Sequence, residues 1–243
     1  MKNVTIEYLG GSGFLVGFHE RHFLFDVDLP DQKSEDYGRF REKLSDIEHL
    51  YVFSSHEICD NYAQTLYQLC GDKCTYIFHS DISFENDCLT ISSGDTKTLD
   101  EMEITAYEST DTGIAYLIRT PELTFFHGGT LNLWHWREQS SITQIEEAER
   151  KFSRIINTIP KNQIDISFFS IDPRQGSMYD AGAINFIMTV KPRILIPMCF
   201  ENRPDIALRF SISGETQHTK VIAIDSPGKK VMISLPDVPQ SSK

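Results

Sequence analysis

The chain is poor in basic residues and contains no long apolar run. Its 23 Lys and Arg residues are outnumbered by 35 Asp and Glu residues, which gives a formal net charge of −12 at pH 7. Binding of nucleic acid needs a basic surface that neutralises phosphates, so nucleic acid is not an expected partner. The same charge disfavours docking on an anionic membrane. No apolar segment reaches the roughly 18–20 residues that cross a bilayer, so a membrane is not an expected partner either.

Cysteines are few and unevenly spaced. The chain has five of them, Cys59, Cys70, Cys74, Cys88 and Cys199, and an odd, irregular set does not indicate a disulfide framework. Cys70 and Cys74 lie close together in C-G-D-K-C, but no second pair completes the four ligands of a structural zinc site. The first residues, M-K-N-V-T-I-E-Y-L-G, alternate like a strand and lack the apolar stretch of a signal peptide. We therefore expect a cytoplasmic protein.

Short apolar stretches separated by turn residues occupy most of the chain, which predicts many strands. Helical spacing replaces this pattern after residue 60 and again from Ser141, which forms a capping box with Gln144. A further helix is predicted at residues 181–190. A chain of 243 residues without linker or repeat favours a single domain, residues 1–235, followed by a frayed tail at 236–243. Many strands with a few separate helices indicate a layered α/β architecture.

Polar residues gather at the ends of the predicted strands, in five segments. They read Y-L-G-G-S-G-F-L-V (residues 8–16), F-S-S-H-E-I-C-D-N-Y (53–62), S-T-D-T-G-I-A-Y-L-I (109–118), F-F-H-G-G-T-L-N-L-W-H-W (125–136), and F-F-S-I-D-P-R-Q-G through K-P-R-I-L-I-P-M-C-F (168–200). In this order they resemble the metallo-β-lactamase superfamily, especially its metal-dependent hydrolases. The resemblance implies a four-layer αβ/βα sandwich, with two facing mixed β-sheets flanked by helices and metals held in loops along one edge.

Most of that family's metal ligands are replaced in this chain. Its motif His-x-His-x-Asp-His falls on residues 56–61, which read His56, Glu57, Ile58, Cys59, Asp60 and Asn61. The bridging carboxylate falls on Thr130, the late histidine on Cys199, and the histidine after the first strand on Gly11. A hydroxyl or an amide oxygen is a poor zinc ligand compared with imidazole or thiolate, and Ile58 has no donor atom. The resemblance therefore implies that the two-metal site has been lost.

Three functions remain open. The first is a hydrolase homologue with a degenerate metal site, which lacks two-metal hydrolysis and keeps a pocket for a small molecule or a partner. The second is an active hydrolase that uses one metal on His56, Asp60 and Cys199, with Asp60 as the catalytic carboxylate. The third is a non-catalytic scaffold that acts through its surface or as a homo-oligomer. The expected cofactor is accordingly none, or one weakly bound zinc ion.

Other residues of the matched segments are candidates for lining the pocket. They are Asn61, Asp111, His127, Thr130, Trp134, Asp172 and Arg174. Each has a structural alternative, since His127 could bond the backbone, the tryptophans could pack against the helix that follows Ser141, and Asp172 could form a plain ion pair. The candidate metal ligands also have a structural alternative, because His56 and Asp60 could form hydrogen bonds within the turn. A serine hydrolase is not indicated, because no G-x-S-x-G segment is present.

Overall fold

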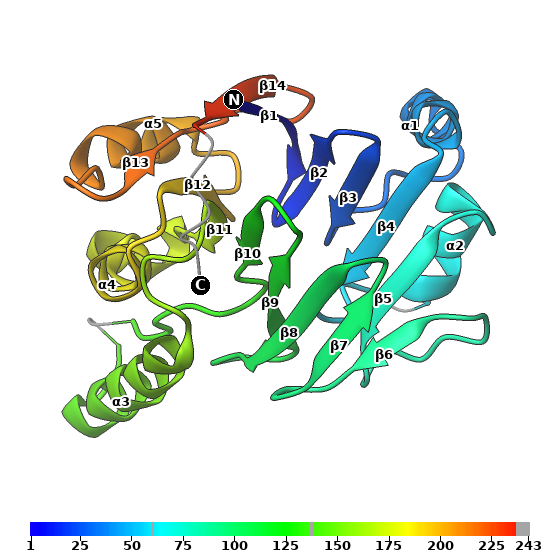
Figure 1. Ribbon diagram of the computed structural model, residues 1–243. Coiled ribbons are helices and arrows are strands. Elements are labelled where there is room, and N and C mark those ends of the chain that lie inside the picture. Colours follow the sequence, from blue (N-terminus) through cyan, green and yellow to red (C-terminus); the bar gives the residue numbers. More distant parts are fainter. Residues whose placement is uncertain (60, 137–138, 237–243) are drawn as a thin grey trace.

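The computed structural model describes residues 1–59, 61–136 and 139–236, and within them two β-sheets of seven strands each are flanked by helices (Figure 1). The first sheet has the order β14-β1-β2-β3-β4-β5-β6. Its strands are β1 (Lys2–Gly10), β2 (Gly13–Phe18), β3 (Arg21–Phe25), β4 (His49–Ser54), β5 (Thr75–His79), β6 (Leu89–Ile91) and β14 (Lys230–Leu235).

The second sheet has the order β13-β12-β11-β10-β9-β8-β7. Its strands are β7 (Thr96–Leu99), β8 (Met102–Glu108), β9 (Ile114–Arg119), β10 (Thr124–His127), β11 (Ile166–Ser170), β12 (Ile194–Met198) and β13 (Lys220–Val221). The helices are α1 (Glu35–Ser45), α2 (Tyr62–Cys70), α3 (Ile142–Thr158), α4 (Ala181–Val190) and α5 (Pro204–Ser213), together with the 3-10 helix η1 (Pro173–Met178).

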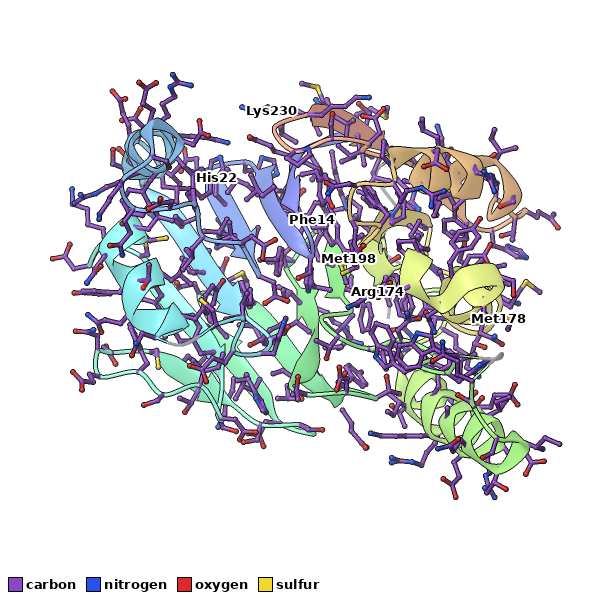
Figure 2. All side chains as sticks on the ribbon, turned by 180° about the vertical axis from the view of Figure 1, so that it is seen from behind. Phe14, His22, Arg174, Met178, Met198 and Lys230 are labelled. Carbon is purple, nitrogen blue, oxygen red and sulfur yellow. The ribbon has the colours of Figure 1, made fainter. Side chains whose placement is uncertain are left out.

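Aromatic side chains fill the space between the two sheets. Phe14 on β2 lies 4.4 Å from Phe168 on β11, measured between ring centroids, and Phe23 on β3 lies 5.5 Å from Phe125 on β10. Figure 2 labels Phe14 and Met198, which come from different sheets and are both fully buried. Burial of this apolar surface is the main stabilising term of the fold.

Helices cover the outer faces of both sheets. Phe169, next in sequence to Phe168 and so on the opposite face of β11, stacks on Phe186 of α4 at 4.5 Å. On the other side of the molecule, Leu44 of α1 and Leu66 of α2 share an apolar cluster with the first sheet. Figure 1 shows α3, α4 and α5 on one side and α1 and α2 on the other. The order is therefore helix, sheet, sheet, helix, and the predicted αβ/βα sandwich is confirmed.

The parallel strands bring their carboxyl ends to a common edge. β3, β4 and β5 run parallel in the first sheet, and β10, β11 and β12 run parallel in the second. The antiparallel strands β2 and β9 begin at this edge, since Ile114 at the start of β9 donates its N–H to the carbonyl of Ser55 just after β4. Loops from distant parts of the sequence therefore meet there.

The predicted helices at 142–158 and 181–190 are confirmed, and Ser141 and Gln144 form the predicted capping box. Two helices, α1 and α5, have no counterpart in the sequence prediction. Only Leu44 of α1 is buried, so α1 has no apolar stripe to reveal it. None of the helices within the described ranges combines the length and the hydropathy needed to span a bilayer. Residues 237–243, most of the predicted frayed tail, lie outside the described residues.

Phe152→Ala is expected to destabilise the protein by about 3–5 kcal/mol, the usual cost of removing a fully buried phenyl ring. Phe152 on α3 is 1% exposed and contacts Phe169 edge-on. Urea unfolding followed by circular dichroism measures the change. His56→Ala is the comparison, and it should cost far less because His56 lies at the edge of the sandwich. Equal losses in the two variants would contradict this assignment of the core.

Candidate functional site

A cavity of about 450 Å³ lies at the edge where the strand ends meet. It is lined by Ser12, His56, Thr110, Asp111, Gly129, Thr130, Trp134, Trp136, Ser170, Asp172, Arg174 and Cys199. These residues come from loops that are up to 187 positions apart in the chain. A larger cavity of about 890 Å³ lies at the opposite end of β4 and β9, beside Tyr51 and Arg21, and contains none of the predicted site residues.

Most of the predicted site residues that the structure describes lie in this cavity. His56, Asp111, Thr130, Trp134, Asp172, Arg174 and Cys199 all line the cavity. His127 is fully buried and Asn61 is the exposed N-cap of α2, and neither is among the lining residues. Asp60, the predicted catalytic carboxylate and metal ligand, lies outside the described residues.

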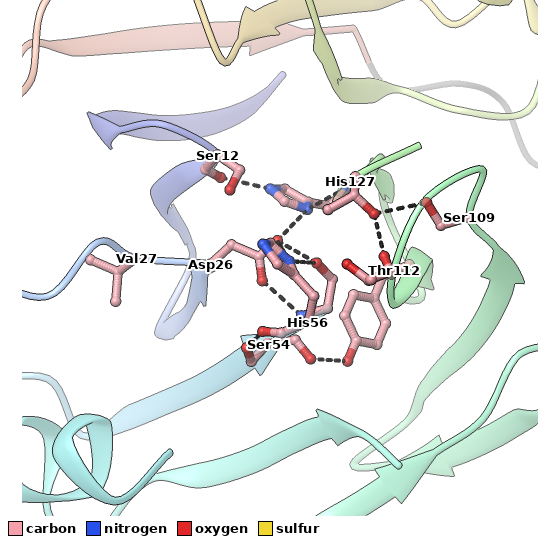
Figure 3. A network of polar contacts seen from close by, with 12 residues as sticks. Ser12, Asp26, Val27, Ser54, His56, Ser109, Thr112 and His127 are labelled. Carbon is pink, nitrogen blue, oxygen red and sulfur yellow. Dashed lines mark hydrogen bonds and ion pairs between the residues drawn. The ribbon is translucent and has the colours of Figure 1, made fainter. Parts of the chain in front are cut away.

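Asp26 lies at the centre of a hydrogen-bonded network under the cavity (Figure 3). Its side chain is 1% exposed. One carboxylate oxygen, Oδ1, accepts the Ser55 backbone N–H at 2.7 Å, and the other, Oδ2, accepts the Ser55 hydroxyl at 2.6 Å. The sequence prediction did not include Asp26. The available signal was its position in H-F-L-F-D-V-D, directly after an apolar strand that pairs in parallel with the strand preceding His56.

The network determines which nitrogen of His56 carries a proton. Ser55 Oγ lies 2.9 Å from His56 Nδ1, and its single hydroxyl proton is donated to Asp26. Ser55 Oγ must therefore act as an acceptor toward His56, which places a proton on Nδ1. In the neutral ring Nε2 then carries a lone pair, which has no hydrogen-bond donor among the described residues. Because His56 lines the cavity, this lone pair makes the imidazole a hydrogen-bond acceptor for a ligand.

His127 has a structural role beneath the cavity. Its Nε2–H donates to the Ser12 carbonyl at 2.8 Å, while its Nδ1 accepts the Gly129 N–H at 3.2 Å. The ring stacks on Phe25 with an interplanar angle of 6°. Burial lowers the pKa of His127, with the nearby Asp26 carboxylate opposing this effect. Both ring nitrogens of this neutral side chain are thus occupied, and the pairing with the backbone is the structural alternative that the sequence left open.

The residues at the replaced ligand positions are poorly suited to bind a metal. Thr130 donates its hydroxyl to the Thr112 carbonyl and contacts the Ser109 hydroxyl at 2.8 Å, so its oxygen already has partners within the loop. Burial raises the pKa of Cys199 to about 12, which disfavours the thiolate that would ligate zinc. Ile58 packs against the apolar cluster beneath α2.

No three His, Cys, Asp or Glu side chains in the described part of the chain are grouped so that they could hold a metal ion. Within the described residues, the positions matched to ligands contribute one imidazole, a hydroxyl that is already bonded and a protonated thiol, and this set does not fit the two-metal centre implied by the resemblance.

Two tryptophans form an aromatic wall of the cavity. Trp134 and Trp136 stack with their ring centroids 6.2 Å apart and an interplanar angle of 17°. Trp134 is oriented by its indole N–H, which donates to the Thr130 carbonyl at 2.9 Å, whereas Trp136 is 40% exposed. His135 between them is buried, and neither of its ring nitrogens has a hydrogen-bond partner among the described residues.

The cationic group of the cavity is already paired with acids. Arg174 donates from Nε and Nη2 to both oxygens of the buried Asp172 side chain, and its Nε lies 3.4 Å from Glu201. Asp172 also accepts the Arg174 backbone N–H at 2.9 Å, which caps η1. These carboxylates raise the pKa of Arg174, and they leave little free positive charge to attract an anionic ligand.

Comparison with solved structures identifies the fold. The metallo hydrolase Igni18 from the archaeon Ignicoccus hospitalis superposes with a TM-score of 0.67 and 16% identity, over 96% of this chain and 100% of that one. The metallo-β-lactamase fold protein YhfI from Bacillus subtilis gives a TM-score of 0.58 and 14% identity, over 96% of this chain and 100% of that one. The chain therefore has the metallo-β-lactamase fold.

The fold alone does not define the reaction. The diiron β-hydroxylase CmlA from Streptomyces venezuelae also superposes, with a TM-score of 0.58 and 11% identity, over 96% of this chain and 54% of that one. At the level of sequence, no family model matches the chain and no curated protein shows significant similarity to it. The function must consequently be argued from the residues of the site.

Proposed function

We propose that this protein is a metallo-β-lactamase-fold hydrolase homologue that lacks two-metal hydrolysis and binds a small molecule in the cavity lined by His56. The proposal rests on the difference between the bonded side chains at the positions matched to metal ligands and the open cavity beside them. The side chains at or beside the former ligand positions, such as Thr130 and His127, are bonded to protein groups, yet the cavity beside them is about 450 Å³ in volume. A cavity of this size, with one apolar wall and a few polar groups, is typical of a small-ligand site.

The lining residues define the chemical class of the ligand. The stacked tryptophans offer a flat apolar surface to a planar ring. His56 Nε2 accepts a hydrogen bond, so the ligand needs a donor group. Among the described lining residues, Asp111 and Asp172 are acidic and Arg174 is basic, and Arg174 is also paired with Glu201. These charges favour a neutral or cationic planar molecule over an anionic one.

Tryptophan fluorescence can test this proposal directly, because the chain has only two tryptophans and both line the cavity. Adenosine and adenosine monophosphate form a suitable pair of probes, since they share a planar ring with donor groups and differ in charge. Adenosine should quench the emission with saturation and should bind more tightly than the monophosphate. Trp136→Ala should weaken adenosine binding about tenfold, the usual contribution of one aromatic contact. Equal and non-saturating quenching by both probes would remove the support for a ligand pocket.

Asp26→Asn should reverse the protonation of His56. The asparagine amide can keep the Ser55 N–H bond through its oxygen, while its NH₂ group donates to Ser55 Oγ. The hydroxyl proton then turns toward His56 Nδ1, and the ring proton moves to Nε2. Nitrogen-15 NMR of the histidine side chains distinguishes the two tautomers. An unchanged Nδ1–H tautomer in a well-folded variant would show that Asp26 does not control His56 through Ser55.

A hydrolase with one metal is the second candidate, because the structure brings His56 and Cys199 to the same cavity. Purified protein should nevertheless carry well under one equivalent of zinc, manganese or iron, since the Cys199 thiol is held protonated and Thr130 is already bonded. Elemental mass spectrometry of protein prepared without chelator measures this content. One full equivalent that disappears in Cys199→Ala would favour the one-metal hydrolase over the ligand-binding homologue.

A further inference from the structure

Two thiols lie in contact at the C-terminal end of α2, in a region that the candidate site does not include. Cys70 is the last residue of α2, and Cys74 immediately precedes β5. Gly71, with φ of +85°, turns the chain back between them. The Cys74 thiol donates to the Cys70 carbonyl with a sulfur–oxygen distance of 3.3 Å, and the two thiols also interact with each other. Both cysteines are free and partly accessible to solvent.

The surroundings distinguish the two thiols chemically. Cys70 packs against the apolar cluster between α2 and the first sheet. The interaction between the two thiols lowers the pKa of Cys74 and raises that of Cys70, and burial raises the pKa of Cys70 further. The Tyr76 hydroxyl, which bonds to the Gly71 carbonyl at 2.6 Å, adds a second polar group beside Cys74. Cys74 is therefore the thiol that ionises first, and Cys70 is the adjacent thiol that can resolve an adduct.

We propose that Cys70 and Cys74 form a redox-active dithiol, which low-molecular-weight disulfides convert into an intramolecular Cys70–Cys74 disulfide. In the first step the Cys74 thiolate attacks one sulfur of the small disulfide, forms a mixed disulfide and releases one small thiolate. In the second step Cys70 loses its proton to solvent and attacks the sulfur of Cys74, which releases the second small thiolate. The two protein thiols are oxidised and the small disulfide is reduced to two thiols, so atoms and electrons balance.

The position of the pair separates this chemistry from that of the cavity. The disulfide would join the last residue of α2 to the residue before β5, and it would replace the hydrogen bond from Cys74 to the Cys70 carbonyl. The other end of α2 follows the stretch that carries His56. The carbonyl groups at the C-terminal end of α2 oppose a thiolate, and we therefore expect oxidation over minutes to hours.

Oxidised glutathione is the probe for this proposal, with the full-length protein and peptide mapping after alkylation of free thiols. The expected result is the loss of two free thiols, a direct Cys70–Cys74 link and complete reversal by dithiothreitol. In Cys70→Ser the reaction should stop at a glutathione adduct on Cys74. In Cys74→Ser no Cys70 adduct should form over the same period. Cys88→Ser is the matched control, because Cys88 is a partly buried cysteine on the same cluster and burial raises its pKa.

The proposal is overturned if wild-type protein retains both thiols, or if the link joins other cysteines. It is also overturned if Cys70→Ser accumulates its adduct on Cys59, the exposed cysteine, and none on Cys74. The wild-type result alone decides the matter if a variant fails to fold, and thermal melting of each variant checks this.

Discussion

Asp26→Ala should destabilise the protein by about 3–5 kcal/mol, because two buried donors lose their acceptor. The Ser55 N–H and hydroxyl both bond to this carboxylate, at 2.7 and 2.6 Å, in a region where water cannot replace it. Each unsatisfied buried group costs roughly 1–3 kcal/mol. The substitution also removes the free-energy cost of burying the charged carboxylate. The expected loss of stability is therefore smaller than the sum of the two largest penalties for the unsatisfied groups.

Denaturant unfolding of Asp26→Ala provides the measurement, with Asp28→Ala as the matched control. Asp28, two residues further along the chain, is an exposed residue, yet burial of its carboxyl group and the neighbouring Asp26 raise its pKa. A raised pKa means that folding does not stabilise the ionised carboxylate, so removal of Asp28 should not destabilise the protein by more than about 0.5 kcal/mol. A loss below about 1 kcal/mol in Asp26→Ala would mean that the network under the cavity contributes little to stability.

Gly113→Ala is expected to cost about 3–4 kcal/mol and to disrupt the turn that carries His56. Gly113 has φ of +79°, a left-handed conformation that an alanine adopts only with strain. An added Cβ would lie 2.2 Å from the Ser55 carbonyl oxygen and 2.8 Å from His56 Cβ. The start of β9 would have to move away from the end of β4, which breaks the bond from the Ile114 N–H to the Ser55 carbonyl.

Gly38→Ala is the control for this substitution. Gly38 lies within α1, and a Cβ added there meets no atom within 4 Å. Alanine is the better helix former, so this variant should be more stable by roughly 0.5–1 kcal/mol. Thermal melting compares both variants, and the NMR signals of His56 report on the turn. A native-like melting temperature for Gly113→Ala would contradict the close approach of β4 and β9 at this glycine.

The elements that could be predicted from the sequence are those with clear local patterns. The capping box at Ser141 and the apolar stripe of α3 follow directly from residue spacing, and both are present. Helix α1 escaped prediction because it buries only Leu44 and lies on the surface of the sandwich. A helix of this kind is stabilised by its Ser34 cap and its side-chain pairs, which leave no hydrophobic period in the sequence.

The candidate site was predictable as a group of loops but not as a network. The resemblance was sufficient to place His56, Thr130 and Cys199 at one edge, and the structure finds all three in one cavity. The same resemblance placed Ile58 at a histidine position of the motif, but it did not indicate that this side chain packs into the apolar cluster under α2. Restoring a histidine at that position would therefore require the turn to rearrange before the new imidazole could reach the cavity.

The sequence by itself determined the layered α/β class, the excess of acidic residues and the residue types in the loops of the candidate site, because these depend on local periodicity, composition and the identity of single residues. Only the tertiary structure decided which polar groups are satisfied. Asp26 and Ser55 are 29 positions apart and His127 reaches Ser12 across 115, so their hydrogen bonds exist only after the two sheets have packed. The placement of the His56 proton on Nδ1, and of the lone pair on Nε2, follows from that network, since one hydroxyl proton cannot be donated to two acceptors.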